Sequence, residues 1–259
     1  MSQTFFHDGF DLAYLDEGDG EPILLLHGFA SNMAINWINP GWVKTLVDAG
    51  YRVLAFDHRG HGRSTKSYDP ALYSPDAMAS DAVALLDHLD LPRAHVMGYS
   101  MGARVAAFLA LQAPSRIASL ILGGLGSGMV DGVGDWDPIA DALATDDPDT
   151  ITHERGKMFR AFADQTRSDR RALAACISES RAELSQADMA QINQPTLVAV
   201  GTKDDIGGSP ERLAAMMPHG EAFAIEGRDH MLAVGDRTFK ARALQFLQAH
   251  PIQAGAISR

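Results

Sequence analysis

The chain has 259 residues, 46% of them hydrophobic, which is enough for one large domain with a complete core. Its formal net charge of −11 disfavours nucleic acid or an anionic membrane surface as a partner, because both carry phosphate. No apolar run reaches the roughly 18 residues of a membrane span, and the first residues lack the basic region of a secretory signal. We therefore expect a cytoplasmic protein with a small-molecule partner, while the oligomeric state is left open. The lone cysteine, Cys176, lies in an apolar helical pattern typical of core.

The first half of the sequence alternates strand and helix patterns. Two short alternating runs around Asp8-Gly9 predict an opening β-hairpin. Apolar runs then predict strands at 22–28, 52–57, 94–99 and 118–124. Helical patterns lie between them at 41–50, 74–90 and 100–112, and Ser74 with Pro75 is a typical start for the second of these helices. Apolar strands separated by helices predict a mainly parallel central sheet with helices on both faces, an α/β fold.

Residues 125–192 interrupt this alternation with helical patterns and no convincing strand. After them the alternation resumes with strands at 196–201 and 221–227 and helices at 209–217 and 236–248. A crossover helix lying on the sheet would not need so long a segment. We therefore predict a core domain formed by 1–124 and 193–259, with 125–192 inserted as a helical cap.

The segment Gly98-Tyr99-Ser100-Met101-Gly102 places a serine between two glycines where a strand meets a helix. A sharp turn there would expose the Ser100 hydroxyl as a nucleophile, although a chain with 24 glycines can contain such a pentapeptide by chance. Other reactive residue types also follow predicted strands: His27, the pair Asp204 and Asp205, and His230. Because ligands bind at the carboxyl ends of strands in open α/β sheets, we expect these groups to meet at one edge.

Taken together, these motifs resemble the α/β-hydrolase family, and the likeness extends over nearly the whole chain. The matching elements are the nucleophile elbow 98–102, the strand-terminal His27-Gly28, the loop "DHRGHGRS" at 57–64, and the Gly-x-x-Asp and Gly-x-x-His motifs at 201–204 and 227–230. The order of nucleophile, acid and histidine is also that of the family. The resemblance implies the α/β-hydrolase fold, with the cap as its least determined part.

The chemistry of acyl transfer gives each residue a role. Ser100 would be the nucleophile, His230 the base that takes its proton, and Asp204 the acid that orients the imidazole. The resemblance assigns the oxyanion hole to the backbone N–H groups of Phe29 and Met101. Adjacent side chains on an extended segment point in opposite directions, so we expect only one of Asp204 and Asp205 to face His230. The resemblance implies that this residue is Asp204, which occupies the Gly-x-x-Asp position counted from Gly201.

Further residues are candidates for structural or substrate-binding roles. His58 and His61, three residues apart and close to Asp57, could indicate a metal site, but the loop fits the family motif and no further ligand is evident. We therefore expect no metal and no cofactor, and we expect His27 to organise the oxyanion loop. An apolar substrate pocket is predicted from Met129, Met158, Phe159, Phe162, Met231 and Leu232.

A serine nucleophile disfavours the epoxide hydrolase and haloalkane dehalogenase reactions of this family, which use an aspartate. The resemblance implies a carboxylesterase-type serine hydrolase that acts on small to medium carboxylic esters through an acyl-serine intermediate. Lactones, carbon–carbon bonds of diketone-like substrates and a cofactor-free peroxidase side activity are neighbouring alternatives. A slow-turnover ligand receptor with the same fold is an alternative of another class.

Overall fold

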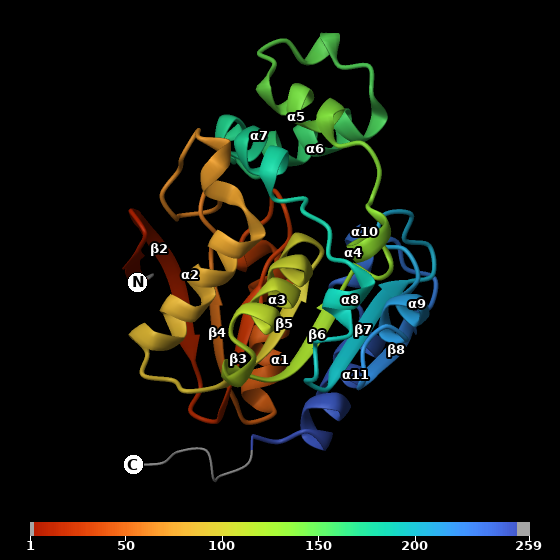
Figure 1. Ribbon diagram of the computed structural model, residues 1–259. Coiled ribbons are helices and arrows are strands. Elements are labelled where there is room, and N and C mark those ends of the chain that lie inside the picture. The colour runs from red at the N-terminus through yellow and green to blue at the C-terminus, as the bar shows by residue number, and fades with distance from the viewer. Residues whose placement is uncertain (1–2, 253–259) are drawn as a thin grey trace.

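One eight-stranded sheet forms the centre of the protein, in a computed structural model that describes residues 3–252 (Figure 1). The strand order is β1-β2-β4-β3-β5-β6-β7-β8. The strands span Gln3–His7 (β1), Phe10–Glu17 (β2), Glu21–Leu26 (β3), Tyr51–Phe56 (β4), Ala94–Tyr99 (β5), Ile117–Gly123 (β6), Thr196–Gly201 (β7) and Gly220–Ile225 (β8). Only β2 runs antiparallel to its neighbours β1 and β4, whereas the strands from β4 to β8 pair in parallel. The predicted opening hairpin and mainly parallel sheet are confirmed.

Side chains of the central strands alternate between two hydrophobic cores. In β3, Leu24 and Leu26 enter the core on one face, while Ile23 and Leu25 enter the core on the other. The first core is closed by α2 (Pro75–His88) and α3 (Met101–Gln112), and the second by α1 (Trp42–Asp48) and α11 (Arg237–Ala249). The sheet is therefore covered on both faces, which explains why its central strands read as continuous apolar runs.

The edge strand β8 departs from this pattern, because it pairs only with β7 and leaves Glu221, Ala222 and Ala224 exposed.

The start of α2 agrees with its sequence signature. The Ser74 hydroxyl accepts a hydrogen bond from the N–H of Ala77 at 3.2 Å, and Pro75 opens the helix. The short helices α9 (Pro210–Ala214) and α10 (His230–Ala233) follow β7 and β8.

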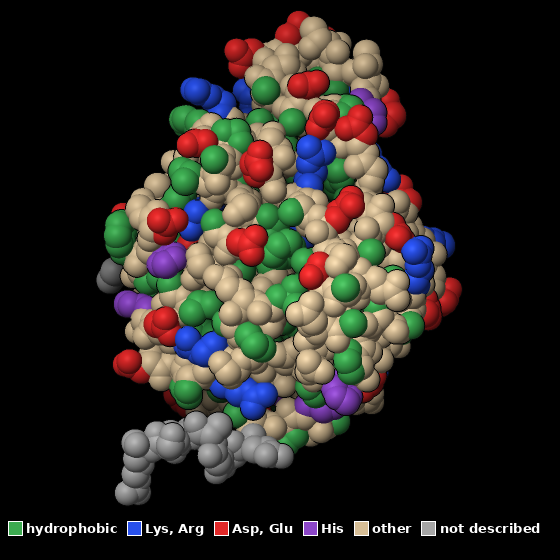
Figure 2. Space-filling view, in the orientation of Figure 1, with side chains coloured by type: hydrophobic (Ala, Val, Ile, Leu, Met, Phe, Trp, Pro, Cys, Tyr) green, Lys and Arg blue, Asp and Glu red, His purple; other side chains and the backbone are tan. Residues whose placement is uncertain are grey.

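Five α-helices, one short 3-10 helix (Pro148–Thr150) and no strand occupy the chain between β6 and β7. The α-helices are α4 (Gly128–Asp131), α5 (Asp137–Ala144), α6 (Glu154–Gln165), α7 (Arg170–Glu179) and α8 (Gln186–Met189). Helices α5, α6 and α7 contact one another and lie beyond the carboxyl ends of the parallel strands, whereas α4 and α8 lie lower, beside the sheet (Figure 1). Figure 2 shows acidic side chains gathered at the end of the molecule that α5 and α6 form.

Cys176 is fully buried in α7, as its apolar surroundings in the sequence predict. Across residues 3–252 no helix combines the length and the apolar character needed to cross a membrane. The predicted cytoplasmic location stays a prediction.

Candidate active site

Ser100 occupies a strained turn between β5 and α3. Its backbone angles, φ 55° and ψ −113°, lie where a residue with a Cβ is rarely found. The turn is possible because the chain passes very close to itself on both sides. A Cβ added to Gly98 would lie 2.1 Å from the carbonyl oxygen of Gly102, and one added to Gly102 would lie 2.0 Å from that of Leu26. Both glycines are therefore required for the strand to pass directly into the helix and to expose the Ser100 hydroxyl.

The structure brings Ser100, His230 and Asp204 into one hydrogen-bonded chain. His230 Nε2 lies 3.0 Å from Ser100 Oγ, and His230 Nδ1 lies 2.8 Å from Asp204 Oδ2. The other carboxylate oxygen of Asp204 accepts hydrogen bonds from the N–H groups of Ile206 and Gly207, both at 2.9 Å. With both oxygens of Asp204 engaged, the His230 ring is held with Nδ1–H toward the acid and with Nε2 free to accept the serine proton.

Two opposing effects act on the pKa of Asp204. Burial raises it, but the hydrogen bond from His230, the electrostatic attraction to that ring and the two backbone N–H groups lower the pKa below its usual value overall. Asp204 is therefore an anion at neutral pH although its side chain has no exposed surface. A buried carboxylate of this kind stabilises the imidazolium that forms when His230 accepts a proton.

The neighbouring Asp205 lies outside this chain of hydrogen bonds. Its side chain is 80% exposed and comes within 3.6 Å of Arg155. The expected alternation of side chains along an extended segment does not apply here, because the chain turns directly after Gly201. The N–H of Asp204 donates to the carbonyl of Gly201 at 3.0 Å, so a turn, and not a strand, directs Asp204 toward His230.

His230 is fixed at the first position of α10 by contacts to its backbone and its neighbours. The Asp229 carboxylate caps this helix by accepting from the N–H groups of Met231 and Leu232. The Tyr99 hydroxyl donates a hydrogen bond of 2.6 Å to the His230 carbonyl. Tyr99 immediately precedes Ser100, so the same short segment positions both the nucleophile and its base.

The backbone N–H groups of Phe29 and Met101 flank the nucleophile from two directions. Phe29 follows β3, and Met101 is the first residue of α3. Within residues 3–252 neither N–H donates a hydrogen bond to the protein itself. Both remain available to a developing oxyanion, and the dipole at the start of α3 also favours negative charge at Met101.

Two buried histidines hold the loop that carries Phe29. His27 Nδ1 donates to the Gly28 carbonyl at 2.8 Å, and its Nε2 accepts from the His58 N–H at 3.0 Å. His61 Nδ1 donates to the Arg59 carbonyl at 3.0 Å, and its Nε2 accepts from the Ala30 N–H at 3.3 Å. Each ring has one donating and one accepting nitrogen, so both histidines are neutral in this arrangement.

Burial keeps these rings neutral over a wide pH range. It lowers the pKa of His27 to about 4 and that of His61 to about 3. The ring of His58 packs 4.6 Å from that of His27, and its pKa is also lowered well below the usual value by burial. Within the described chain no group of three His, Cys, Asp or Glu side chains could hold a metal ion. His27 thus lies where the sequence suggested, against the oxyanion loop.

Asn36 and Asp57 also support this loop, and no sequence motif predicts the role of Asn36. Asn36 Oδ1 accepts from the Gly28 N–H at 2.7 Å, and Asp57 Oδ1 accepts from the Met33 N–H at 2.8 Å. The loop 57–64 therefore supports the oxyanion loop through direct hydrogen bonds. The buried pair of Arg59 and Asp81, at 2.7 Å, ties the loop 57–64 to α2.

A cavity of about 290 Å³ opens above Ser100 and His230. Of the predicted pocket residues, the cavity is lined by Phe159, Phe162, Met231 and Leu232. Met129 and Met158 do not line it. Met129 is fully buried in the core, and Met158 is 42% exposed. Because one turn of α6 separates Phe159 from Phe162, these two share the face toward the cavity, whereas Met158 points elsewhere.

Trp136 is a lining residue that the sequence did not single out. Its ring centre lies 5.5 Å from that of Phe159 and 6.5 Å from that of Phe29. It therefore joins the helical segment between β6 and β7 to the oxyanion loop through aromatic contacts.

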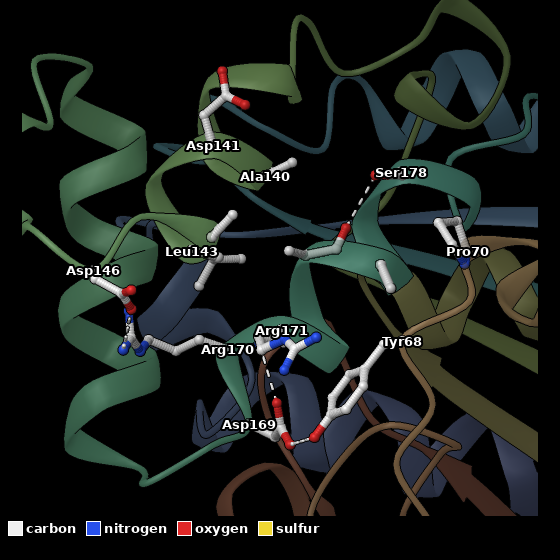
Figure 3. Close-up of a pocket in the computed structure, with 13 residues that line it drawn as sticks. Tyr68, Pro70, Ala140, Asp141, Leu143, Asp146, Asp169, Arg170, Arg171 and Ser178 are labelled. Atoms are coloured by element: carbon white, nitrogen blue, oxygen red, sulfur yellow. Dashed lines mark hydrogen bonds and ion pairs between the residues drawn. The ribbon is translucent and has the colours of Figure 1, made fainter.

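A wider hollow of about 820 Å³ lies away from this chemistry, between α5, α7 and residues 68–70 (Figure 3). The Tyr68 hydroxyl donates to Asp169 Oδ2 at 3.0 Å, and the Arg171 guanidinium lies over the Tyr68 ring. None of the three residues Ser100, His230 and Asp204 lines this hollow. The cavity of about 290 Å³, which Ser100 and His230 line, is the candidate active site.

Comparisons with known proteins agree with the observed fold. A family model described as the alpha/beta hydrolase fold matches residues 21–173. A non-heme chloroperoxidase of Kitasatospora aureofaciens is 27% identical over 93% of this chain and 97% of its own. A rhodomycin D methylesterase of a Streptomyces species is 42% identical over 42% of this chain, and the match spans only 38% of that relative.

A solved hydrolase structure from Pseudomonas aeruginosa superposes with a TM-score of 0.76 at 26% identity, covering 95% of this chain and 97% of the other. Together with the eight-stranded, mostly parallel sheet and the family match over residues 21–173, this likeness identifies the chain as a member of the α/β-hydrolase fold family.

Proposed function

We propose that this member of the hydrolase family is a carboxylesterase-type serine hydrolase that cleaves small to medium carboxylic esters through an acyl-serine intermediate on Ser100. The observation that carries the proposal is the hydrogen-bonded chain from Ser100 Oγ through His230 to Asp204, with distances of 3.0 and 2.8 Å. The methylesterase relative supports ester chemistry, because its name describes cleavage of an ester.

The reaction follows from the placement of these groups. His230 Nε2 accepts the hydroxyl proton as Ser100 Oγ attacks the ester carbonyl, and the N–H groups of Phe29 and Met101 stabilise the oxyanion. The imidazolium then returns its proton to the departing alcohol, which leaves an acyl-serine. Water attacks this intermediate with His230 again as base, and the acid is released as Ser100 recovers its proton.

We further propose that residues 125–192 act as a cap that shapes the substrate cavity. Trp136, Phe159 and Phe162 come from this segment and line the cavity above Ser100. Other lining residues, among them Ile35 and Met231, come from the core. The core would thus supply the reacting groups, and the helical segment would supply much of the apolar surface for the substrate.

A substrate panel tests the proposal. We expect turnover of carboxylic esters of graded acyl length that exceeds turnover of a lactone and a diketone in the same panel. Ser100→Ala should retain the fold, checked by circular dichroism, and lose on the order of 10⁴-fold or more in kcat. A preference for the lactone or the diketone would contradict ester hydrolysis as the main activity and would show that the same residues catalyse lactone hydrolysis or carbon–carbon bond cleavage.

The likeness to a chloroperoxidase over nearly the full chain favours one second candidate. Hydrogen peroxide could take the place of water at the acyl-serine, and attack by its oxygen would release a peroxy acid and free Ser100. Peroxy acid formation from an ester and hydrogen peroxide, absent in Ser100→Ala, would establish this activity.

A further inference from the structure

Two cavities meet at Ser100, and they differ in which catalytic groups they contain. The cavity of about 290 Å³ contains His230 but not Met101. A second, smaller cavity of about 40 Å³ contains Met101 but not His230. Ser100, Phe29 and Trp136 line both. The ester bond that is cleaved would therefore lie across the junction of the two cavities.

The positions of the proton donor and the oxyanion hole decide which part of an ester enters which cavity. The departing oxygen must lie beside His230, because that residue protonates it, so the alcohol part belongs in the larger cavity. The carbonyl oxygen is directed to the N–H groups of Phe29 and Met101. The acyl chain, which is the remaining substituent of the carbonyl carbon, would then enter the smaller cavity on the Met101 side.

The smaller cavity has room for only a short chain. A volume of 40 Å³ corresponds to about three water molecules, which is comparable to one methylene and one carboxylate group. Long acyl chains would not fit there without displacement of its walls.

Each polar side chain that lines the smaller cavity can donate a hydrogen bond. Trp136 Nε1 is buried with no hydrogen-bond partner, and the buried Ser180 Oγ has only the Cys176 thiol, a weak partner, beside it. Two guanidinium groups, those of Arg104 and Arg181, also line this cavity. None of the described residues that line it carries a carboxylate, although the chain as a whole has a net charge of −11.

Arg104 is a buried cation without an acidic partner. It lies on α3, one turn after Ser100, and is 4% exposed. Its Nη1 and Nη2 atoms donate to the carbonyls of Gly128, Met129 and Ala182, and no carboxylate in the described chain lies within 4.0 Å of it. Burial lowers its pKa to about 10, despite the attraction of the more distant Glu183. Arg181, by contrast, is paired with Asp137 at 2.9 Å.

We infer that the smaller cavity binds an acyl group that is short and ends in a carboxylate, so that the preferred substrates are half-esters of short dicarboxylic acids with an apolar alcohol. This inference rests on the proposed ester hydrolysis at Ser100 and adds the substrate class. A carboxylate would supply hydrogen-bond acceptors for Ser180 and Trp136 and an opposite charge for Arg104, and charge-assisted hydrogen bonds of this kind are strong. The largely apolar surface of the larger cavity suits an aryl or alkyl alcohol.

The test compares two benzyl esters of nearly the same shape. Monobenzyl malonate has a carboxylate where benzyl 3-methylbutanoate has an isopropyl group, and benzyl alcohol release is measured for both by chromatography. We expect kcat/KM to favour the malonate half-ester at least tenfold. Ser180→Ala and Arg104→Met should each reduce that ratio at least fivefold.

Ser178→Ala is the matched control, because Ser178 lies two residues before Ser180 and its exposed hydroxyl donates to the Ala174 carbonyl at 3.0 Å. This variant should leave the ratio unchanged. Arg104→Met also removes hydrogen bonds to three backbone carbonyls. If Arg104→Met does not fold, Ser180→Ala decides the outcome.

Faster cleavage of the uncharged ester by the unmodified protein would overturn the inference while leaving ester hydrolysis intact. A preference for the half-ester that survives both substitutions would place the carboxylate elsewhere and would also overturn it. Absence of turnover for both esters, together with no modification of Ser100 by a serine-directed reagent, would instead contradict the proposed function itself.

Discussion

The sheet edge formed by the carboxyl ends of the parallel strands and the helical segment α5–α7 are held in place by different kinds of interaction. At this sheet edge, backbone groups and buried polar side chains hold the reactive residues. Asp204 accepts hydrogen bonds from two backbone N–H groups, and His27 and His61 hold the oxyanion loop. The helical segment contacts the oxyanion loop through aromatic rings. It contacts residues 68–70 through the exposed hydrogen bond between Tyr68 and Asp169. On our proposal, the type of reaction depends on the sheet edge, and the helical segment contributes to the choice of substrate.

Substitution of the two neighbouring aspartates gives the largest expected effect. Asp204→Asn should lower kcat by up to about 10⁴-fold, because an amide in place of the carboxylate would favour the wrong tautomer of His230. Asp205→Asn, at an exposed side chain, is the matched control and should stay within about tenfold of the parent. Steady-state kinetics on one ester measures both, and the reverse order of effects would show that Asp205 is the acid.

The oxyanion loop should make the stability of the protein sensitive to acid. Folding lowers the pKa of His27 from 6.5 to about 4 and that of His61 from 6.5 to about 3. Below pH 6.5 the unfolded chain therefore binds protons that the folded protein does not, and stability falls as the pH falls. Between pH 7.5 and pH 5 each of these histidines should remove about 2 kcal/mol from the free energy of unfolding.

Urea unfolding at pH 7.5, 6.5 and 5.0 measures this loss. His61→Gln should weaken the dependence on pH, even if it lowers stability at neutral pH. His219→Gln is the control, because His219 is exposed and should leave the dependence unchanged. A free energy of unfolding that stays constant from pH 6.5 to pH 5.0 would show that these rings are not held neutral.

The helical segment should produce the smallest effect, and one confined to substrate choice. Phe159→Leu shortens a side chain that lines the cavity, so the ratio of kcat/KM for esters of small and large alcohols should change by about tenfold. Met158→Leu, one residue earlier on the exposed face of α6, should leave this ratio unchanged. A ratio that stays unchanged in Phe159→Leu as well would mean that this face of α6 has no part in specificity.

Much of the fold followed from the sequence, because the alternation of strand and helix patterns and the turn residues around them are local signals. Ser100, His230 and Asp204 could be proposed for a similar reason, since each follows an apolar strand in a short motif. Asp204 faces His230 because of a turn after Gly201, so the expected alternation of side chains did not describe the local backbone.

The cavity was harder to predict, because its lining depends on how one helix is rotated against a distant loop. Met158 and Phe159 are adjacent in the sequence, yet only Phe159 lines the cavity. The support that Asn36 gives to Gly28 depends on a contact made only after folding, as does the lack of an acidic partner for Arg104.

The central claim is that Ser100 is the nucleophile activated at the edge of the sheet. Intact-mass spectrometry after reaction with a serine-directed aryl phosphonate tests it most directly. The account predicts one phosphonyl adduct on the unmodified protein, located on Ser100 by peptide mapping, and no adduct on Ser100→Ala. An equal adduct on Ser100→Ala, or a folded Ser100→Ala variant that retains full ester turnover, would contradict it.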